Sequence, residues 1–368
     1  MLTPPELDRY SRQLTLSELG VAGQERLRSA NVLIVGAGGL GSPVALYLAA
    51  AGVGHIGILD DDTVELSNLH RQILHATVDV ARAKAASARD AIARLNPEVR
   101  VTPHVLRLDR HNATGIIAGY DLVVDGSDNY ETRYAVNDAC AHLGKPWVYG
   151  SVERFSGQVS LFGAPDGPCY RCVYPEAPAP GSTASCEEIG VLGAIPGVIG
   201  SLQAVEALKW LAGIGHPLVG RLLQFDFKTG QSRSVAIERR EGCAVCGSSR
   251  GLDPPPVRAA ATGSRPDLEP AELAVLLQQP DAPALLDVRE PWEWSVARIP
   301  AATLLPLDEL RAGVKALDRA RPLVVYCHHG SRSGAAAEWL RAEGFQARNL
   351  VGGIDRWSRD VDPQVPRY

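Results

Sequence analysis

Long apolar runs and an excess of basic residues are both missing from this sequence of 368 residues. No apolar run approaches the roughly 18 residues that a membrane-spanning helix needs, so no membrane association is expected. The formal net charge of −5 gives no support for nucleic-acid binding, which usually requires a basic surface. The first ten residues, MLTPPELDRY, lack the basic and apolar regions of a signal peptide, and we therefore expect a cytoplasmic protein.

Cysteine is also scarce, and four of the seven cysteines form two CxxC pairs, Cys169–Cys172 and Cys243–Cys246. In a cytosolic chain this spacing favours metal ligation over disulfide bonds. Two thiolates from each pair complete the four corners of a zinc tetrahedron, so we predict a structural Zn²⁺ site with no open coordination position. A redox-active dithiol and free thiols are the alternatives.

Residues 31–41, NVLIVGAGGLG, predict a buried strand, a glycine turn and a helix in direct succession. This order directs backbone N–H groups and a helix N-terminus at a phosphate. The next predicted strand, His55–Leu59, ends at Asp60, an acid well placed to accept hydrogen bonds from a ribose. A nicotinamide-dependent dehydrogenase is the first hypothesis from these residues alone, but it leaves the CxxC pairs unexplained.

Two polar segments follow predicted strands. Residues 61–72 come directly after Asp60, and GSDN at 126–129 follows the strand Leu122–Asp125. Because the carboxyl ends of parallel strands share one edge of a sheet, we expect both segments near the glycine turn. Strands alternate with helices as far as residue 151, which predicts an α/β fold with a doubly wound, mostly parallel, Rossmann-like sheet.

The pattern changes beyond residue 151. Three segments, Gly157–Phe162, Leu222–Phe227 and Ser232–Ile237, are predicted as antiparallel strands that extend the sheet, the last two joined by a hairpin turn. The apolar segment Pro196–Leu211 predicts a helix that belongs to the core or to a subunit interface.

Residues 248–265 divide the chain. Their three consecutive prolines and small residues predict a linker between a first domain, 1–247, and a smaller α/β domain, 266–368.

The second domain carries a cysteine on a loop between a predicted strand and a predicted helix, in the sequence CHHGSRS at 327–333. A cysteine cradled by the N–H groups of such a loop is nucleophilic, and Arg332 adds positive charge. Arg332 follows Cys327 by five positions, a shorter spacing than in a phosphatase and one suited to a terminal sulfur atom. A metal site at His328 and His329 is disfavoured, because neighbouring loop side chains rarely converge on one ion.

The motifs GAGGLG, SNLHRQ, GSDN, CYRC, CEEIGVLGAIPGVIG and CAVC occur in this order along the chain. With them, residues 1–247 resemble the MoeB/ThiF-type adenylyltransferases of the ubiquitin-activating-enzyme family. Residues 266–368 resemble a rhodanese domain. The fusion is similar to the MoeZ-type adenylyltransferase–sulfurtransferases.

The resemblance implies an ATP site with bound Mg²⁺. Arg12, Arg71 and Lys84 would offset negative charge on the phosphates, Asp128 would hold Mg²⁺, and Arg12 matches an arginine that reaches the partner's ATP in family homodimers. The family's nucleotide-binding positions correspond in this sequence to Gly39, Gly41, Asp60, Ser67, Asn68, Leu69, His70, Arg71, Lys84, Asp128 and Asn129.

The resemblance also implies a partner, a ubiquitin-like sulfur carrier with a C-terminal Gly-Gly. Its carboxylate would be adenylated, and a persulfide on Cys327, loaded from thiosulfate or a cysteine desulfurase, would turn it into a thiocarboxylate. Cys186 would form a thioester or resolve an acyl disulfide. A carrier of the molybdopterin-synthase type is favoured, and carriers for thiamine, tRNA thiolation or cysteine biosynthesis are alternatives. A nucleotide-binding protein with an inactive tail is the alternative from another functional class.

Overall fold

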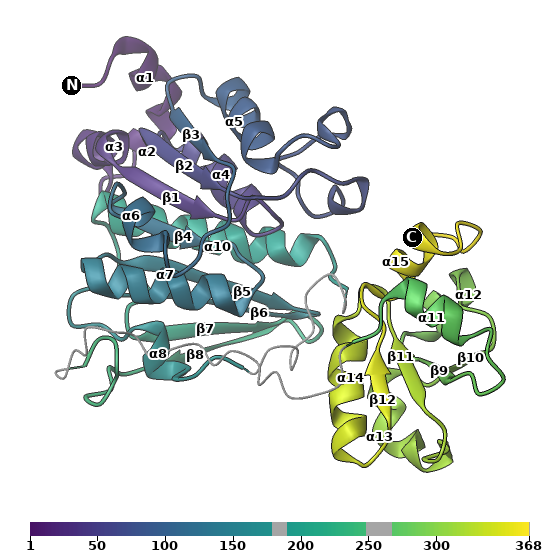
Figure 1. The fold of residues 1–368 in the computed structure, drawn as a ribbon. Coiled ribbons are helices and arrows are strands. Elements are labelled where there is room, and N and C mark those ends of the chain that lie inside the picture. Colours follow the sequence, from purple (N-terminus) through teal and green to yellow (C-terminus); the bar gives the residue numbers. More distant parts are fainter. Residues whose placement is uncertain (179–189, 248–266, 368) are drawn as a thin grey trace. The chain divides into compact units, whose positions relative to one another are not determined.

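A computed structural model describes residues 1–178, 190–247 and 267–367. The described residues form two compact units, the first from 1–177 and 190–247 and the second from 267–367 (Figure 1). The predicted linker and Cys186 lie outside the described residues. Nowhere in the three described ranges is there a helix with the length and apolar character needed to cross a lipid bilayer.

The first unit is organised around one eight-stranded sheet. Its strands are β1 (Asn31–Val35), β2 (His55–Leu59), β3 (Arg100–His104), β4 (Leu122–Asp125), β5 (Trp147–Glu153), β6 (Ser156–Phe162), β7 (Arg221–Asp226) and β8 (Gln231–Ala236). They lie in the order β3-β2-β1-β4-β5-β6-β7-β8, parallel as far as β5 and antiparallel from there. The predicted doubly wound sheet with an antiparallel extension is therefore confirmed.

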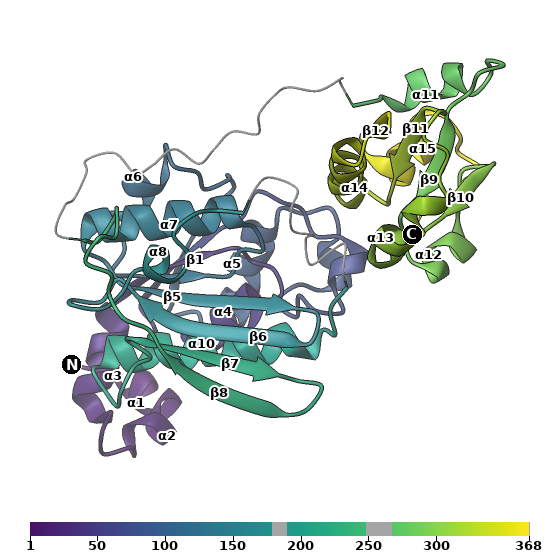
Figure 2. The ribbon, with the colours of Figure 1, turned by 90° about the horizontal axis from the view of Figure 1, so that it is seen from below.

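Helices cover both faces of this sheet. The helices and 3-10 turns of the unit are α1 (Pro4–Arg9), α2 (Ser11–Leu14), α3 (Gly20–Ser29), α4 (Gly41–Ala50), η1 (Leu66–Asn68), η2 (Thr77–Asp79), α5 (Lys84–Leu95), α6 (Ala113–Ile117), α7 (Tyr130–Leu143), α8 (Tyr170–Val173) and α10 (Ala194–Ala212). Buried side chains of α3, α4, α5 and α10 share one apolar cluster, and those of α6, α7 and α8 share the other (Figures 1 and 2).

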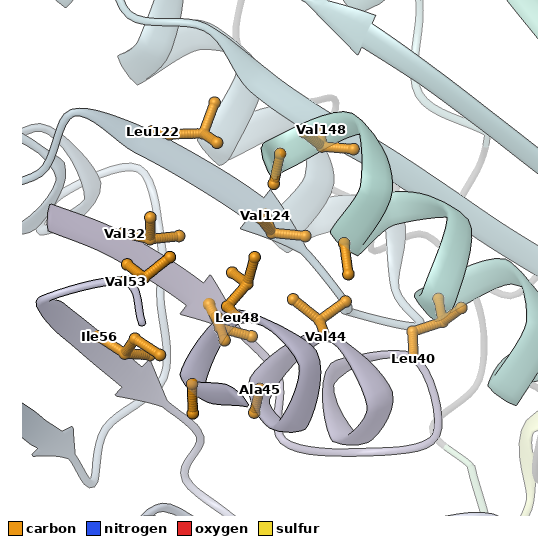
Figure 3. Packing of buried hydrophobic residues seen from close by; sticks show 14 of the residues in the cluster. Val32, Leu40, Val44, Ala45, Leu48, Val53, Ile56, Leu122, Val124 and Val148 are labelled. Carbon is orange, nitrogen blue, oxygen red and sulfur yellow. The ribbon is translucent and has the colours of Figure 1, made fainter. Parts of the chain in front are cut away.

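The central strands are apolar throughout because both of their faces are covered. Val32 of β1 packs on the α4 and α10 side, whereas its neighbour Leu33 packs on the α6 and α7 side. Figure 3 shows Val44 and Leu48 of α4 between that helix and the sheet, which carries Val32 and Val124. Each fully buried side chain of this size contributes about 1.5–3 kcal/mol to folding.

Two helix predictions were inaccurate in extent. The segment predicted as one or two helices over Leu7–Ala30 contains parts of three, and the last of them, α3, begins at Gly20, which takes a left-handed φ of +52°. The helix predicted over Asp79–Leu95 begins only at Lys84, because Ala81 has a φ of +71°, which is incompatible with the interior of a right-handed helix.

The second unit contains a four-stranded parallel sheet in the order β10-β9-β11-β12. Its elements are α11 (Pro270–Leu276), β9 (Ala284–Asp287), α12 (Pro291–Val296), β10 (Ala302–Leu304), η3 (Leu307–Glu309), α13 (Leu310–Gly313), η4 (Val314–Ala316), β11 (Leu323–Tyr326), α14 (Ser331–Ala342), β12 (Ala347–Asn349) and α15 (Gly353–Asp360). The single helix predicted over Leu307–Ala316 is broken into three short turns, and Gly313, a weak helix former, ends the central one. The α/β character predicted for this unit is confirmed.

Candidate functional site

The glycine turn after β1 is tight because it is pressed against the loop after β4. Gly36 has a φ of +88°, and a Cβ atom added there would lie 2.8 Å from the carbonyl oxygen of Gly126. A Cβ on Gly41 would overlap the carbonyl oxygen of Gly36. Side chains are therefore excluded at both positions, because the turn packs directly against backbone atoms of its own loop and of the loop after β4.

Asp60 lies beside the glycine turn and is hydrogen-bonded to it. Its two carboxylate oxygens accept hydrogen bonds from the backbone N–H groups of Ala37, at 2.7 Å, and Asp62, at 2.9 Å. Burial raises the pKa of Asp60, and the nearby charge of Lys84 and these N–H groups act against that rise. The carboxylate is thus fixed beside the turn, where a ribose lies in dinucleotide-binding folds.

Lys84 lies at the start of α5 and is buried. Its ammonium group is 2.9 Å from a carboxylate oxygen of Asp62, and its backbone N–H donates to the Asp62 carbonyl. Lys84 therefore places a positive charge at the carboxyl edge of the sheet. Asp60 and the exposed Asp62 lie near this charge.

The segment after β2 brings Arg71 to the glycine turn. A Cβ on Gly39 would lie 3.7 Å from Cγ of Arg71 and 3.2 Å from Pro196 of α10. The Arg71 guanidinium donates to the carbonyl oxygen of Ser67 at 3.1 Å, and the side chain of Asn68 is buried. Leu69 and His70, by contrast, are half-buried and exposed.

Asp128 and Asn129 follow β4 and lead into α7. Asp128 is exposed, and Asn129 caps α7 by accepting the N–H of Thr132 at 2.9 Å. The exposed carboxylate is accessible to a cation, and hard cations such as Mg²⁺ prefer carboxylate oxygens.

The sequence analysis missed the support beneath this loop. Asp125, fully buried at the end of β4, accepts hydrogen bonds from the N–H and hydroxyl of Ser127 at 3.0 and 2.6 Å. Arg133 pairs with Asp125 and also donates to the Ser127 carbonyl at 3.1 Å. An aspartate that ends an apolar strand, LVVD, is the sequence signal that could have indicated this network.

Arg12 is not brought to the site. It is exposed on α2, and the next side chain, Gln13, donates to the carbonyl oxygen of Ala51 just after α4. The glycine turn lies at the other end of α4, whose ten residues span about 15 Å. Arg12 therefore lies at the opposite end of this helix from the chain's own glycine turn.

The two CxxC pairs converge, as their spacing predicts. The Sγ atoms of Cys169, Cys172, Cys243 and Cys246 all lie within 4.8 Å of one another, with Sγ–Sγ distances of 3.9 Å (169–172), 3.6 Å (169–243) and 3.4 Å (172–246). A tetrahedral Zn²⁺ with its usual bond lengths separates its sulfur ligands by about 3.8 Å. The cluster therefore fits the dimensions of a Cys₄ metal site.

The surroundings of the cluster also suit a metal. The backbone N–H of Arg240 donates to Cys172 Sγ at 3.4 Å, and such N–H donors stabilise metal-bound thiolates. Hydrogen bonding with Cys172, burial and the neighbouring sulfurs raise the pKa of Cys169, and a bound cation would act in the opposite direction by stabilising its thiolate. Cys140 of α7 lies outside this cluster and is completely buried in the apolar core.

In the second unit, Cys327 follows β11 and is buried. Its Sγ accepts the N–H of Gly330 at 3.1 Å and lies 3.4 Å from the hydroxyl oxygen of Ser333. Gly330 has a φ of +100°, which lets the loop curl back over the sulfur before α14 begins. The loop thus presents hydrogen-bond donors to the cysteine sulfur, as expected for a persulfide-carrying cysteine.

Arg332 has a partner that the sequence analysis did not identify. Its guanidinium forms a bidentate ion pair with Glu293 of α12, with both N–O distances at 2.8 Å, and both side chains are buried. The positive charge that the sequence analysis assigned to the cysteine cradle is therefore balanced by a carboxylate. Sequence reasoning missed Glu293, because it lies 39 residues before Arg332.

Comparisons with known proteins agree with this arrangement. The ThiF family profile matches residues 10–245, and the rhodanese-like domain profile matches residues 269–360. The chain is 43% identical to the Mycobacterium tuberculosis protein named "Probable adenylyltransferase/sulfurtransferase MoeZ", covering all of this chain and 96% of that protein. It is 40% identical to the Drosophila yakuba adenylyltransferase and sulfurtransferase MOCS3, covering all of this chain and 86% of that protein.

A crystal structure of Escherichia coli MccB with ATP shares the fold, with a TM-score of 0.58 and 23% identity over 65% of this chain and 74% of that chain. The MccB structure supports the fold alone, whereas the two relatives match in sequence over the full length of this chain. The chain therefore belongs to the ThiF family, and with its C-terminal rhodanese-like domain it is an adenylyltransferase and sulfurtransferase of the MoeZ and MOCS3 type.

Proposed function

We propose that this enzyme uses ATP to adenylate the C-terminal glycine carboxylate of a ubiquitin-like sulfur carrier and then converts it into a thiocarboxylate with sulfur held on Cys327. The observation that carries the proposal is the presence in one chain of two sites. One is a glycine turn with Asp60 and Lys84 beside it, and the other is a cysteine sulfur held by N–H and hydroxyl donors.

In the first reaction the carrier carboxylate attacks the α-phosphate of ATP, and pyrophosphate leaves. Backbone N–H groups of the glycine turn at Gly39 and Gly41 contact the phosphates, and Asp60 accepts hydrogen bonds from the ribose. Lys84 and Arg71 offset the charge that builds on the phosphate oxygens, and Asp128, with Asn129 beside it, holds Mg²⁺. No general base is needed, because the attacking carboxylate is already ionised. Ser67, Asn68, Leu69 and His70 complete the wall of the nucleotide site.

In the second reaction a Cys327 persulfide attacks the acyl carbon and AMP leaves, which gives an acyl disulfide. A second thiol, for which we propose Cys186, attacks Cys327 Sγ; the carrier thiocarboxylate leaves, and a Cys186–Cys327 disulfide forms that an external thiol must reduce. The persulfide itself is loaded from thiosulfate or from a cysteine desulfurase.

We further propose a homodimer and a structural Zn²⁺. Arg12 lies at the far end of α4 from its own glycine turn, which supports a role for this arginine at the ATP site of a second copy. Zn²⁺ at the four cysteines joins the segment after β6 to the segment after β8 and supports the fold without taking part in the reaction.

The test is mass spectrometry of candidate carriers with a C-terminal Gly-Gly, incubated with the enzyme, ATP, Mg²⁺ and thiosulfate. The proposal expects one oxygen of the carrier to be replaced by one sulfur, only with ATP and only when Cys327 is present. Cys327→Ser should still release pyrophosphate but yield no thiocarboxylate. Cys186→Ser should slow the release of thiocarboxylate, and a normal rate would remove Cys186 from the mechanism.

The same measurement, made with several carriers, identifies the preferred carrier protein. We propose a molybdopterin-synthase-type carrier, for molybdenum cofactor biosynthesis, as the preferred substrate. Carriers for thiamine, tRNA thiolation and cysteine biosynthesis are compared with it at equal concentration. Thiocarboxylate formation on one of those carriers at a higher kcat/KM would contradict the preference but leave the chemistry intact.

A further inference from the structure

A buried serine next to Cys327 has more hydrogen-bond acceptors around it than it can satisfy. Ser333, the third residue of α14, is completely buried, and its Oγ lies 3.4 Å from Cys327 Sγ. The same oxygen lies 2.7 Å from Oδ1 of Asn349 and 3.2 Å from the carbonyl oxygen of Gly330. A hydroxyl group has one proton to donate, so these three acceptors compete for it.

Asn349, the last residue of β12, is held in place from its other side. Its Nδ2 donates to a carboxylate oxygen of Asp267 at 3.3 Å, which turns Oδ1 toward Ser333. An amide oxygen only accepts, so the short Ser333–Asn349 contact places the hydroxyl proton on that bond. A neutral Cys327 thiol then donates its own proton to the Ser333 oxygen, whereas a thiolate requires the hydroxyl to rotate and donate.

We propose that Ser333 is a catalytic residue of the sulfurtransferase site, which donates its proton to Cys327 Sγ when that sulfur is negatively charged. Asn349 is then a positioning residue that holds the proton while the sulfur is neutral. This inference rests on the proposed sulfur chemistry of Cys327 and adds a residue to it.

The charge on Sγ is present at both ends of a sulfur transfer. The thiolate attacks the outer sulfur of thiosulfate, the donor S–S bond breaks, and sulfite leaves with the electron pair. With cyanide as the acceptor, cyanide attacks the outer persulfide sulfur and the electron pair of that S–S bond returns to Sγ. A hydroxyl proton directed at Sγ stabilises the thiolate before the first step and after the second.

Other groups around Cys327 also carry charge or titrate. On the elements packed against it these are His328 and His329 of the loop, the Glu293–Arg332 pair, Asp355 of α15, and the Asp287–Arg289 pair at the end of β9. Burial lowers the pKa of His328 to about 4, so this ring stays neutral at neutral pH. All of these groups are retained when Ser333 is replaced, so a comparison of variants isolates the hydroxyl.

The experiment measures iodoacetamide alkylation of the full-length protein across pH, quantified by mass spectrometry on the tryptic peptide that contains Cys327. At pH values below the half-maximal point, Ser333→Ala should react about ten-fold more slowly, because a hydrogen bond to a charged group is lost. At high pH the fully ionised variant should react as fast as the wild type or faster, because a less stabilised thiolate is the better nucleophile. The two profiles should therefore converge or cross as the pH rises.

A second variant tests the role of Asn349 with the opposite sign. Asn349→Ala removes the competing acceptor, so the half-maximal point should move to lower pH, and this effect should vanish in a Ser333→Ala background. Ser358→Ala is the matched control, because Ser358 is also a buried serine of this unit but donates to the carbonyl oxygen of Val365 at 2.6 Å. Its alkylation profile should coincide with that of the wild type.

Two results would overturn the proposal. Coincident profiles for Ser333→Ala and wild type would show that the hydroxyl does not stabilise the thiolate. A uniform slowing at every pH would show that Ser333 only positions the loop. Neither result depends on a carrier protein. The proposed function has a separate test: if Cys327→Ser still formed thiocarboxylate, that function would be contradicted, whatever the role of Ser333.

Discussion

The buried pair between Glu293 and Arg332 leads to the sharpest stability prediction. The two side chains are only 4% and 7% exposed and form two hydrogen bonds of 2.8 Å. Glu293→Gln would leave the guanidinium buried without its carboxylate, which costs about 3–5 kcal/mol, whereas the same change in an exposed pair costs at most about 1 kcal/mol. In a unit of this size such a loss lowers Tm by more than about 10 °C.

The same pair predicts a pH dependence. Burial alone would raise the pKa of Glu293, but the hydrogen bonds from Arg332 and from the Glu290 N–H, together with the charge of Arg332, lower it overall. A carboxyl group whose pKa is lower in the folded state contributes stability above its unfolded pKa and loses it as the pH falls through its folded pKa. The wild type should therefore lose its advantage over Glu293→Gln in acid, and the two stability curves should converge there.

The assay is thermal unfolding of the full-length protein from neutral to acidic pH. Hydrogen exchange in peptides from β11 and α14 assigns the transition to the second unit. Glu338→Gln is the matched control, because Glu338 is an exposed glutamate on α14, and its effect should stay within about 0.5 kcal/mol. A loss for Glu293→Gln no larger than that of the control, or curves that remain parallel in acid, would refute the reasoning.

Three further predictions concern the first unit. The purified protein should contain about one Zn²⁺ per chain by elemental analysis, and Cys243→Ser should lower that content and the Tm of the unit together. Gly41→Ala should abolish ATP-dependent pyrophosphate release and cost more than about 2 kcal/mol, since its Cβ would overlap the turn. Gly115→Ala, at an exposed position in α6 with open space around it, should not reduce stability or activity. Mixing inactive Arg12→Ala and Lys84→Ala chains should restore about a quarter of the sites if each ATP site takes its arginine from the partner, and no recovery would contradict that arrangement.

The sequence predicted well whatever depends on local order along the chain. The run Asn31–Val35 followed by glycines predicted a strand and a glycine turn, and the structure has both. The CxxC spacing predicted the convergence of four sulfurs, because each pair brings two ligands together within one short turn. The roles assigned to individual nucleotide-site residues remain predictions.

Helix boundaries were less predictable. Whether residue 79 or residue 84 begins α5 depends on a left-handed residue, Ala81, and composition gives no sign of one. Arg12 shows that the position of a side chain relative to a distant site was also not predictable. Its motif suggested an ATP contact, but only the packing of Gln13 on the far end of α4 shows that its own site is out of reach.

The sequence by itself determined which helices and strands form and which residue types lie in each loop. This is because strand alternation, glycine turns and cysteine spacing depend on residues only a few positions apart. The tertiary structure alone decided which charges are balanced and which hydroxyl meets which sulfur. Glu293 lies 39 residues from the arginine that it pairs with, and Ser333 and Asn349 meet only because β12 lies beside β11 in the sheet. Such pairs form when folding removes their side chains from water, where each must find a partner, and no pattern of neighbouring residues encodes which partner that is.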